Sequence, residues 1–125
     1  MPRKTSPTLT EAELRLMQLL WKRGPSTVQQ LVAALEPATP LAYNSVLTTI
    51  RILERKRYVE HAKDGRAHVY APVVGRSEAS RFEVRHLLSR FFNDSHEELV
   101  LNLIEDKTLD EEELKRLRAA LGGRK

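Results

Sequence analysis

The 125-residue chain contains no cysteine, which excludes disulfide bonds, thiol nucleophiles and cysteine-based metal sites. No apolar run approaches the roughly 18 residues that a membrane-spanning helix needs, and the N-terminal residues do not resemble a signal peptide. Recognisable catalytic motifs are also missing, including a nucleophile elbow and a phosphate-binding glycine loop. We therefore expect a cytoplasmic protein that does not insert into a membrane, is not an enzyme and needs no cofactor or metal.

Hydrophobic residues make up 41% of the chain and charged residues 30%, which is typical of a globular protein. The length suits one compact domain, or a small domain with a helical annex. Residues 1–76 carry a net charge of +6, whereas residues 77–125 carry −2. Unless this imbalance is chance scatter, it favours binding of a polyanion by the first part of the chain.

Three amphipathic helices are predicted in the basic part. Thr10 and Glu13 match a capping box that begins the first helix, and Ser26 and Gln29 match a second. The third helix is predicted from about Tyr43 to Arg57, after a proline-containing turn.

The third helix has two contrasting faces. At about 100° per residue, Val46, Ile50, Leu53 and Arg57 share one face, which is otherwise apolar. The opposite face is polar and basic and lacks a carboxylate: Asn44, Thr48, Arg51 and Arg55. Arginine pairs with guanine or phosphate, and asparagine with adenine, so this helix is predicted to enter the major groove of DNA. A solvated surface arginine remains the alternative for Arg51.

Two short strands are predicted after this helix, at Tyr58–Ala62 and His68–Ala71, joined by a turn at Lys63–Arg66 that contains Asp-Gly. A hairpin directly after a reading helix is the wing of a winged helix. The predicted DNA-binding residues of helix and wing are Asn44, Ser45, Thr48, Thr49, Arg51, Arg55, Arg66 and His68. Arg51 is the best candidate for base contact, and Arg55 and Arg66 for phosphate contact.

The aromatic residues and histidines of this region have less specific interpretations. We expect Tyr43 and Tyr70 to pack in the fold rather than stack on bases. His61 and His68 could face one another across the hairpin, although two histidines without a further ligand make a poor metal site.

After Pro72 the pattern is helical throughout. Apolar stripes on three short helices are too extensive to be buried among themselves, so a second copy of the chain is the simplest partner. The predicted dimerisation residues are Val84, Leu87, Leu88, Phe91, Leu99, Val100, Leu103, Ile104, Leu114, Leu117 and Leu121. The predicted fold is therefore mainly α with a small β-hairpin. Residues 1–76 form a winged-helix DNA-binding domain, and residues 77–125 a helical dimerisation domain.

Several stretches, in this order, resemble the penicillinase-repressor family, the BlaI/MecI/CopY group of bacterial regulators. They read LTEAELRLMQLLWKRGPSTVQQLV, AYNSVLTTIRILERKRYV, GRAHVYAPVV, LVLNLIE and LDEEELKRLR. The resemblance covers about Leu9 to Leu121. It implies a homodimeric winged-helix repressor that binds an inverted-repeat operator in double-stranded DNA, commonly at β-lactam resistance genes.

The resemblance also implies how such a repressor is switched off. In antibiotic-responsive members a membrane sensor metalloprotease signals cleavage at an Asn-Phe bond, which corresponds here to Asn102-Leu103. The cysteine metal cluster of the copper-responsive branch is excluded by the composition. The alternative function is a winged-helix module that binds proteins without sequence-specific DNA binding.

Overall fold

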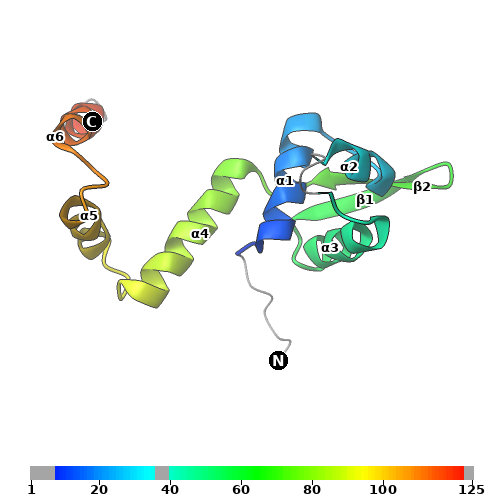
Figure 1. Ribbon diagram of the computed structural model, residues 1–125, viewed down its shortest axis with the longest axis horizontal. Helices are drawn as coiled ribbons and strands as arrows, with labels where there is room; N and C mark the ends of the chain where they lie inside the picture. The colour runs from blue at the N-terminus through cyan, green and yellow to red at the C-terminus, as the bar shows by residue number, and fades with distance from the viewer. Residues whose placement is uncertain (1–7, 36–39, 123–125) are drawn as a thin grey trace. The chain divides into compact units, whose positions relative to one another are not determined.

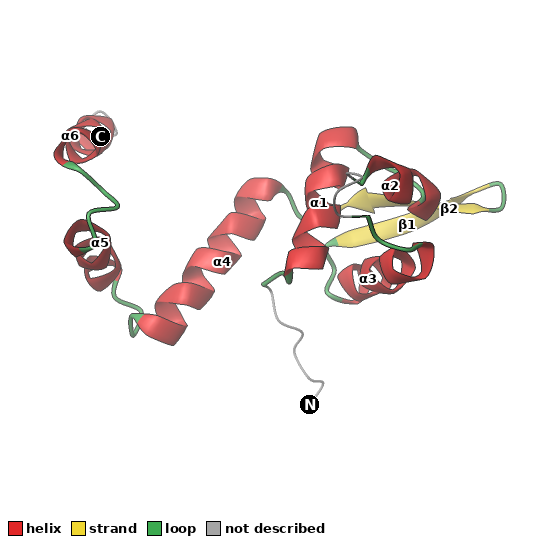
Figure 2. Ribbon diagram, in the orientation of Figure 1, coloured by secondary structure: helices red, strands yellow, loops and turns green. Residues whose placement is uncertain are grey.

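The computed structural model describes residues 8–35 and 40–122, and within them the chain forms six helices and one two-stranded sheet (Figures 1 and 2). The elements are α1 (Glu11–Arg23), α2 (Val28–Ala34), α3 (Tyr43–Arg55), β1 (Val59–Asp64), β2 (Ala67–Pro72), α4 (Arg76–Phe91), α5 (His96–Glu105) and α6 (Glu111–Gly122). The predicted mainly helical fold with one hairpin is confirmed. Among the described residues, no helix combines the length and apolar character needed to cross a membrane.

The chain divides into two compact units, Met1–Glu83 (unit 1) and Val84–Lys125 (unit 2), so the division falls inside α4. The sequence-based boundary after residue 76 lies instead near the beginning of this helix. Two residues of α4 explain the difference. Ala79 is buried in the core of unit 1, and the ring of Phe82 meets that of Tyr58 edge-on at 6.4 Å.

Unit 1 has a single apolar core to which three helices and the hairpin contribute. Its side chains, each at most 5% exposed, include Leu16, Met17, Leu20, Val28, Leu31, Val46, Ile50, Leu53, Tyr58, Val59 and Tyr70. Val46, Ile50 and Leu53 of the predicted inner face of α3 are fully buried, whereas Arg57, which was assigned to the same face, lies beyond the end of the helix and is exposed. Burial of that face fixes which side of α3 remains exposed.

The starts of α1 and α2 are set by capping boxes. The box of Thr10 and Glu13 is present as predicted. In α2, however, the capping residues are Thr27 and Gln30, so the prediction of Ser26 and Gln29 was wrong by one residue. Ser26 is instead buried, and its backbone pairs with that of Tyr70 through hydrogen bonds of 2.9 and 2.8 Å. This pairing ties the second strand to the α1–α2 connection.

The hairpin is longer than predicted. Its antiparallel register runs from Val59 opposite Pro72 to Asp64 opposite Ala67, leaving Gly65 and Arg66 as a two-residue loop. The predicted Asp-Gly loop was therefore shifted by one residue. Gly65 has φ 66°, which suits the first position of a type II′ turn, where glycine is preferred. The loop places Arg66 at the tip of the hairpin.

Candidate nucleic-acid interface

The outer surface of α3 carries most of the predicted DNA-binding residues. Asn44, Ser45, Thr48, Arg51 and Arg55 are all exposed. Thr49 is half-buried, and its hydroxyl donates a hydrogen bond to the carbonyl of Ser45 at 2.8 Å. The hydroxyl proton of Thr49 is thus used within the helix, while the other side chains remain open to a ligand.

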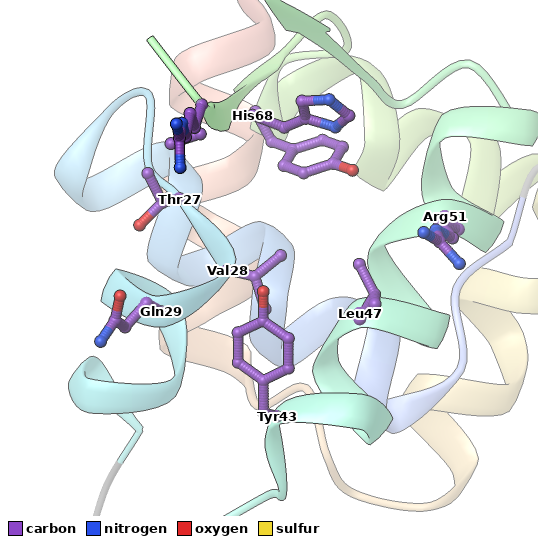
Figure 3. A pocket seen from close by; sticks show the side chains of 10 residues that line it. Thr27, Val28, Gln29, Tyr43, Leu47, Arg51 and His68 are labelled. Carbon is purple, nitrogen blue, oxygen red and sulfur yellow. The ribbon is translucent and has the colours of Figure 1, made fainter. Parts of the chain in front are cut away.

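A cleft of about 290 Å³ lies between the beginning of α2, one side of α3, and β2 with its preceding loop (Figure 3). The residues that line it are Thr27, Val28, Gln29, Tyr43, Leu47, Arg51, Arg66, Ala67, His68 and Tyr70. Arg51, Arg66 and His68, which were predicted separately from helix and hairpin, therefore border the same cleft. Two guanidinium groups beside one concave surface suit an anionic ligand.

The other predicted residues lie around this cleft rather than in its wall. By helical projection, Tyr43, Leu47 and Arg51 form the stripe of α3 that faces the cleft. Asn44 and Thr48 belong to the neighbouring outer stripe. Arg51 lies at the border between the two stripes.

Arg55 belongs to a different hollow at the end of α3. It lines a depression together with Glu54, Arg57, Val59, Glu60 and Val73. The helix ends at Arg55 rather than Arg57, which has φ 68° and begins the connection to β1. The structure therefore separates Arg55 from the cleft of Arg51 and Arg66.

Some residues of the cleft were missed or misinterpreted in the sequence. Tyr43 was predicted to pack in the fold, but its side chain is 51% exposed and extends into the cleft (Figure 3). Tyr70, in contrast, is 2% exposed and packs as predicted. Thr27 and Gln29 were not predicted to contribute at all. Their place follows from the packing of α2 against α3 and the hairpin, which the sequence does not specify.

Histidines connect the two strands of the hairpin. The rings of His61 and His68 stack at 4.5 Å with an interplanar angle of 17°, so the two residues do face one another across the hairpin, as the sequence allowed. His61 Nδ1 lies 2.6 Å from the Glu54 carboxylate of α3. Within the described part of the chain, no three histidine, aspartate or glutamate side chains form a group that could hold a metal ion.

The electrostatics of the cleft wall reflect the same neighbours. Burial is the main cause that raises the pKa of the Tyr70 hydroxyl, and the negative charge of Glu54 adds to it. The Arg51 guanidinium acts in the opposite direction on this pKa. Glu54 and Arg51 thus lie close enough to β2 to shift the pKa of Tyr70 in opposite directions.

Unit 2 exposes many of the side chains that were predicted to form a dimer. Exposed fractions are 45% for Val84, 39% for Leu87, 67% for Phe91, 43% for Val100, 38% for Ile104, 49% for Leu117 and 71% for Leu121. Leu99, Leu103 and Leu114 are half-buried, and Leu88 is buried within the chain at 3%. Leu101 is a further exposed apolar residue, at 46%, that the sequence analysis did not include.

The Asn102-Leu103 peptide bond lies inside α5. Asn102 is exposed and Leu103 is half-buried. The carbonyl of Asn102 accepts a hydrogen bond from the amide of Asp106 at 3.0 Å, and that of Leu103 from the amide of Thr108 at 3.1 Å. A protease must open this last turn of the helix before the bond fits an active site.

Comparison with known proteins places these features in a family. The profile of the penicillinase repressor family matches residues 9–122. The penicillinase repressor of Bacillus licheniformis is 28% identical over 114 residues, which cover 91% of this chain and 89% of that protein. The transcriptional regulator BlaI of Mycobacterium tuberculosis is 44% identical over 71 residues, or 56% of this chain and 51% of that protein.

Two solved structures share the fold of the winged helix. One is the DNA-binding domain of the repressor BlaI, with a TM-score of 0.53 and 26% identity, covering 61% of this chain and 93% of that domain. The other is the monomeric form of Bacillus licheniformis BlaI in complex with the blaP half-operator, with a TM-score of 0.50 and 26% identity. With a family profile that spans nearly all of its length, the chain belongs to the penicillinase repressor family of transcriptional regulators.

Proposed function

We propose that this protein is a homodimeric DNA-binding transcriptional repressor whose α3 reads an inverted-repeat operator while the hairpin, its wing, contacts the backbone. The observation that carries the proposal is that Arg51 of α3 and Arg66 of the wing line the same cleft. The resemblance to a repressor domain that was solved with its half-operator supports it.

The chemistry of α3 suits base recognition. Arg51 is exposed, and within the described residues it has no ion-pair partner, so its guanidinium can bind a guanine edge in bidentate fashion. Asn44 and Thr48 lie on the adjacent stripe and suit adenine and thymine. Arg66 at the wing tip, with His68 nearby, suits phosphate.

The dimer follows from unit 2. α5 and α6 have no buried residue among those described, while large apolar side chains of α4, α5 and α6 are exposed in the single chain. Exposed apolar surface of this extent is typical of an interface. A second copy would bury it and would present two winged helices to two half-sites, as an inverted repeat requires.

We further propose that the repressor acts in the cytoplasm on β-lactam resistance genes and is inactivated by a membrane sensor metalloprotease. The support is the family, in which several relatives are named methicillin resistance regulatory protein. Cleavage at Asn102-Leu103 would remove α6 and the end of α5 and so weaken the dimer. Incubation with such a sensor, followed by mass spectrometry of the fragments, tests the position of the bond.

Selection from a random duplex library tests the DNA-binding function. The full-length protein is expected to enrich a palindromic sequence, and its affinity for that selected duplex should fall steeply with salt concentration. Failure to enrich any sequence, together with salt-insensitive or absent binding, would favour the alternative of a protein–protein interaction module.

Substitution of the two cleft arginines separates base reading from phosphate binding. Arg51→Ala should cost about 1–3 kcal/mol of discrimination between the selected and a scrambled duplex, because a bidentate base contact is lost. Arg66→Ala should weaken binding to both duplexes alike and lower the slope of log affinity against log salt by about 0.9. Fluorescence anisotropy titrations at several salt concentrations measure both quantities. An Arg51→Ala variant with unchanged discrimination would contradict the assignment.

A further inference from the structure

The reading helix α3 contains one carboxylate, Glu54, in its last turn. By helical projection Glu54 belongs to the same stripe as Leu47 and Arg51, which faces the wing. Arg51, three residues earlier, is the partner that helical spacing would favour for it. Glu54 nevertheless pairs with His61 of β1, with 2.6 Å between Oε2 and Nδ1.

The contact continues from β1 to β2. The ring of His61 stacks on that of His68 at 4.5 Å, and its centroid lies 5.4 Å from that of the buried Tyr70. His68 follows Arg66 by two residues in the chain. A continuous series of contacts, from Glu54 through His61 to His68, thus leads from the reading helix to β2, the strand that directly follows the wing-tip Arg66.

The carboxylate of Glu54 is explained neither by a gain in folding stability nor by electrostatic attraction of DNA. The side chains of Glu54 and His61 are 32% and 35% exposed, and polar pairs with that much solvent exposure contribute little to folding. Glu54 also lines the depression that contains Arg55, a predicted phosphate contact, and a negative charge there repels the phosphates of the ligand. The remaining explanation is that the pair of Glu54 and His61 fixes the position of the wing relative to α3. It also keeps the Glu54 carboxylate away from Arg51.

We propose that Glu54 is a positioning residue for DNA recognition. By holding His61, it fixes the wing against α3, so that Arg66 reaches its phosphate while Arg51 stays unpaired for base contact. This inference rests on the DNA-binding function proposed above.

Glu54→Ala is an informative test because the two possible effects have opposite signs. As a mere negative charge near DNA, Glu54 would weaken binding, and its removal would strengthen it. As a positioning residue, its removal would weaken binding. Glu60→Ala is the matched control, since Glu60 is an exposed carboxylate on β1 that has no ion-pair partner among the described residues.

The expected result is that Glu54→Ala lowers affinity for the selected duplex roughly threefold to tenfold, while Glu60→Ala leaves it unchanged or raises it. Arg66→Ala should then change affinity by less than about twofold in the Glu54→Ala background, and the loss of salt slope should shrink with it. His61→Gln removes the imidazole on the wing side of the pair and keeps the Glu54 carboxylate. In this background too, Arg66→Ala should have a smaller effect on affinity than in the wild type. Thermal unfolding of each variant confirms that the measured protein is folded.

Two outcomes would overturn the proposal in different ways. If Glu54→Ala binds as tightly as Glu60→Ala and the cost of Arg66→Ala is the same in both backgrounds, Glu54 does not position the wing, although the protein still reads DNA. If the wild type does not distinguish the selected from a scrambled duplex, the proposed function fails, and the positioning role fails with it.

Discussion

At the scale of single residues, unit 1 contains a charged pair with little solvent exposure: the side chain of Glu13 is 4% exposed and that of Lys56 is 12% exposed. Glu13 Oε1 accepts hydrogen bonds from the Lys56 ammonium at 2.8 Å and from the Thr10 amide at 2.9 Å. Lys56 Nζ also donates to the carbonyl of Thr8 at 3.0 Å. The pair therefore joins the beginning of α1 to the end of α3, and its hydrogen bonds compensate for the burial of the Glu13 carboxylate and the partial burial of the Lys56 ammonium.

The raised pKa of the neighbouring Tyr58 predicts that the folded protein loses stability at alkaline pH. Burial raises the pKa of its hydroxyl to about 12, and the negative charges of Glu83, Glu13 and Glu78 contribute. Between pH 10 and 12 the unfolded chain loses this proton while the folded chain keeps it, so the free energy of unfolding falls as the pH rises. The loss should reach roughly 2–3 kcal/mol by pH 12. Chemical denaturation at several pH values should show a shallower decline in Tyr58→Phe; an equal decline would refute this.

At the scale of elements, the hairpin depends on more than the pairing of its own strands. The backbone of Ser26 pairs with Tyr70, and β2 contacts both α1 and α2. An isolated two-stranded hairpin is marginally stable, so these contacts allow the wing to keep one position. The loop residue Gly65 decides whether the two strands connect in this register.

Substitution of Gly65 tests the turn. At φ 66° an L-residue is strained, and Gly65→Ala should cost about 1–2 kcal/mol of unfolding free energy, although a Cβ atom would meet nothing within 4 Å. Gly122→Ala is the control, because that position ends α6 without a positive φ and is equally open. It should be neutral or slightly stabilising. Equal urea midpoints for Gly65→Ala and the wild type would contradict the assigned turn.

The elements also show how far the sequence could be interpreted. The capping box of Thr10 and the buried stripe of α3 follow from short-range patterns, and both are confirmed. The errors at Ser26 and in the hairpin loop amount to one residue each. In both cases adjacent residues suit the same role, and long-range backbone pairing decides between them.

At the scale of the whole molecule, the two units differ in how they bury apolar surface. Unit 1 has a core of fully buried side chains, whereas α5 and α6 have none among the described residues. A helix gains most of its stability by burying its apolar face. The second unit is thus the part of the chain that a partner would complete.

A negative charge introduced among the exposed apolar side chains of unit 2 should dissociate the proposed dimer. Phe91 is 67% exposed in the single chain, and Phe91→Glu should shift the protein from dimer to monomer in sedimentation velocity. Affinity for the full palindrome should fall strongly, while affinity for a half-site changes little. Ser89→Glu, on an exposed position of the same helix, is the control and should remain dimeric. A wild type that sediments as a monomer at micromolar concentration would refute the dimer.

By itself, the sequence determined the order of helices and strands, the buried face of α3 and the family, because each depends on patterns within a few residues along the chain. The tertiary structure decided which residues of different helices and strands lie close to one another. Arg51 and Arg66 share a cleft with Tyr43, and Glu54 pairs with His61 instead of Arg51. These contacts join residues of different elements, and packing of the core, rather than helical or strand periodicity, sets the distances between them.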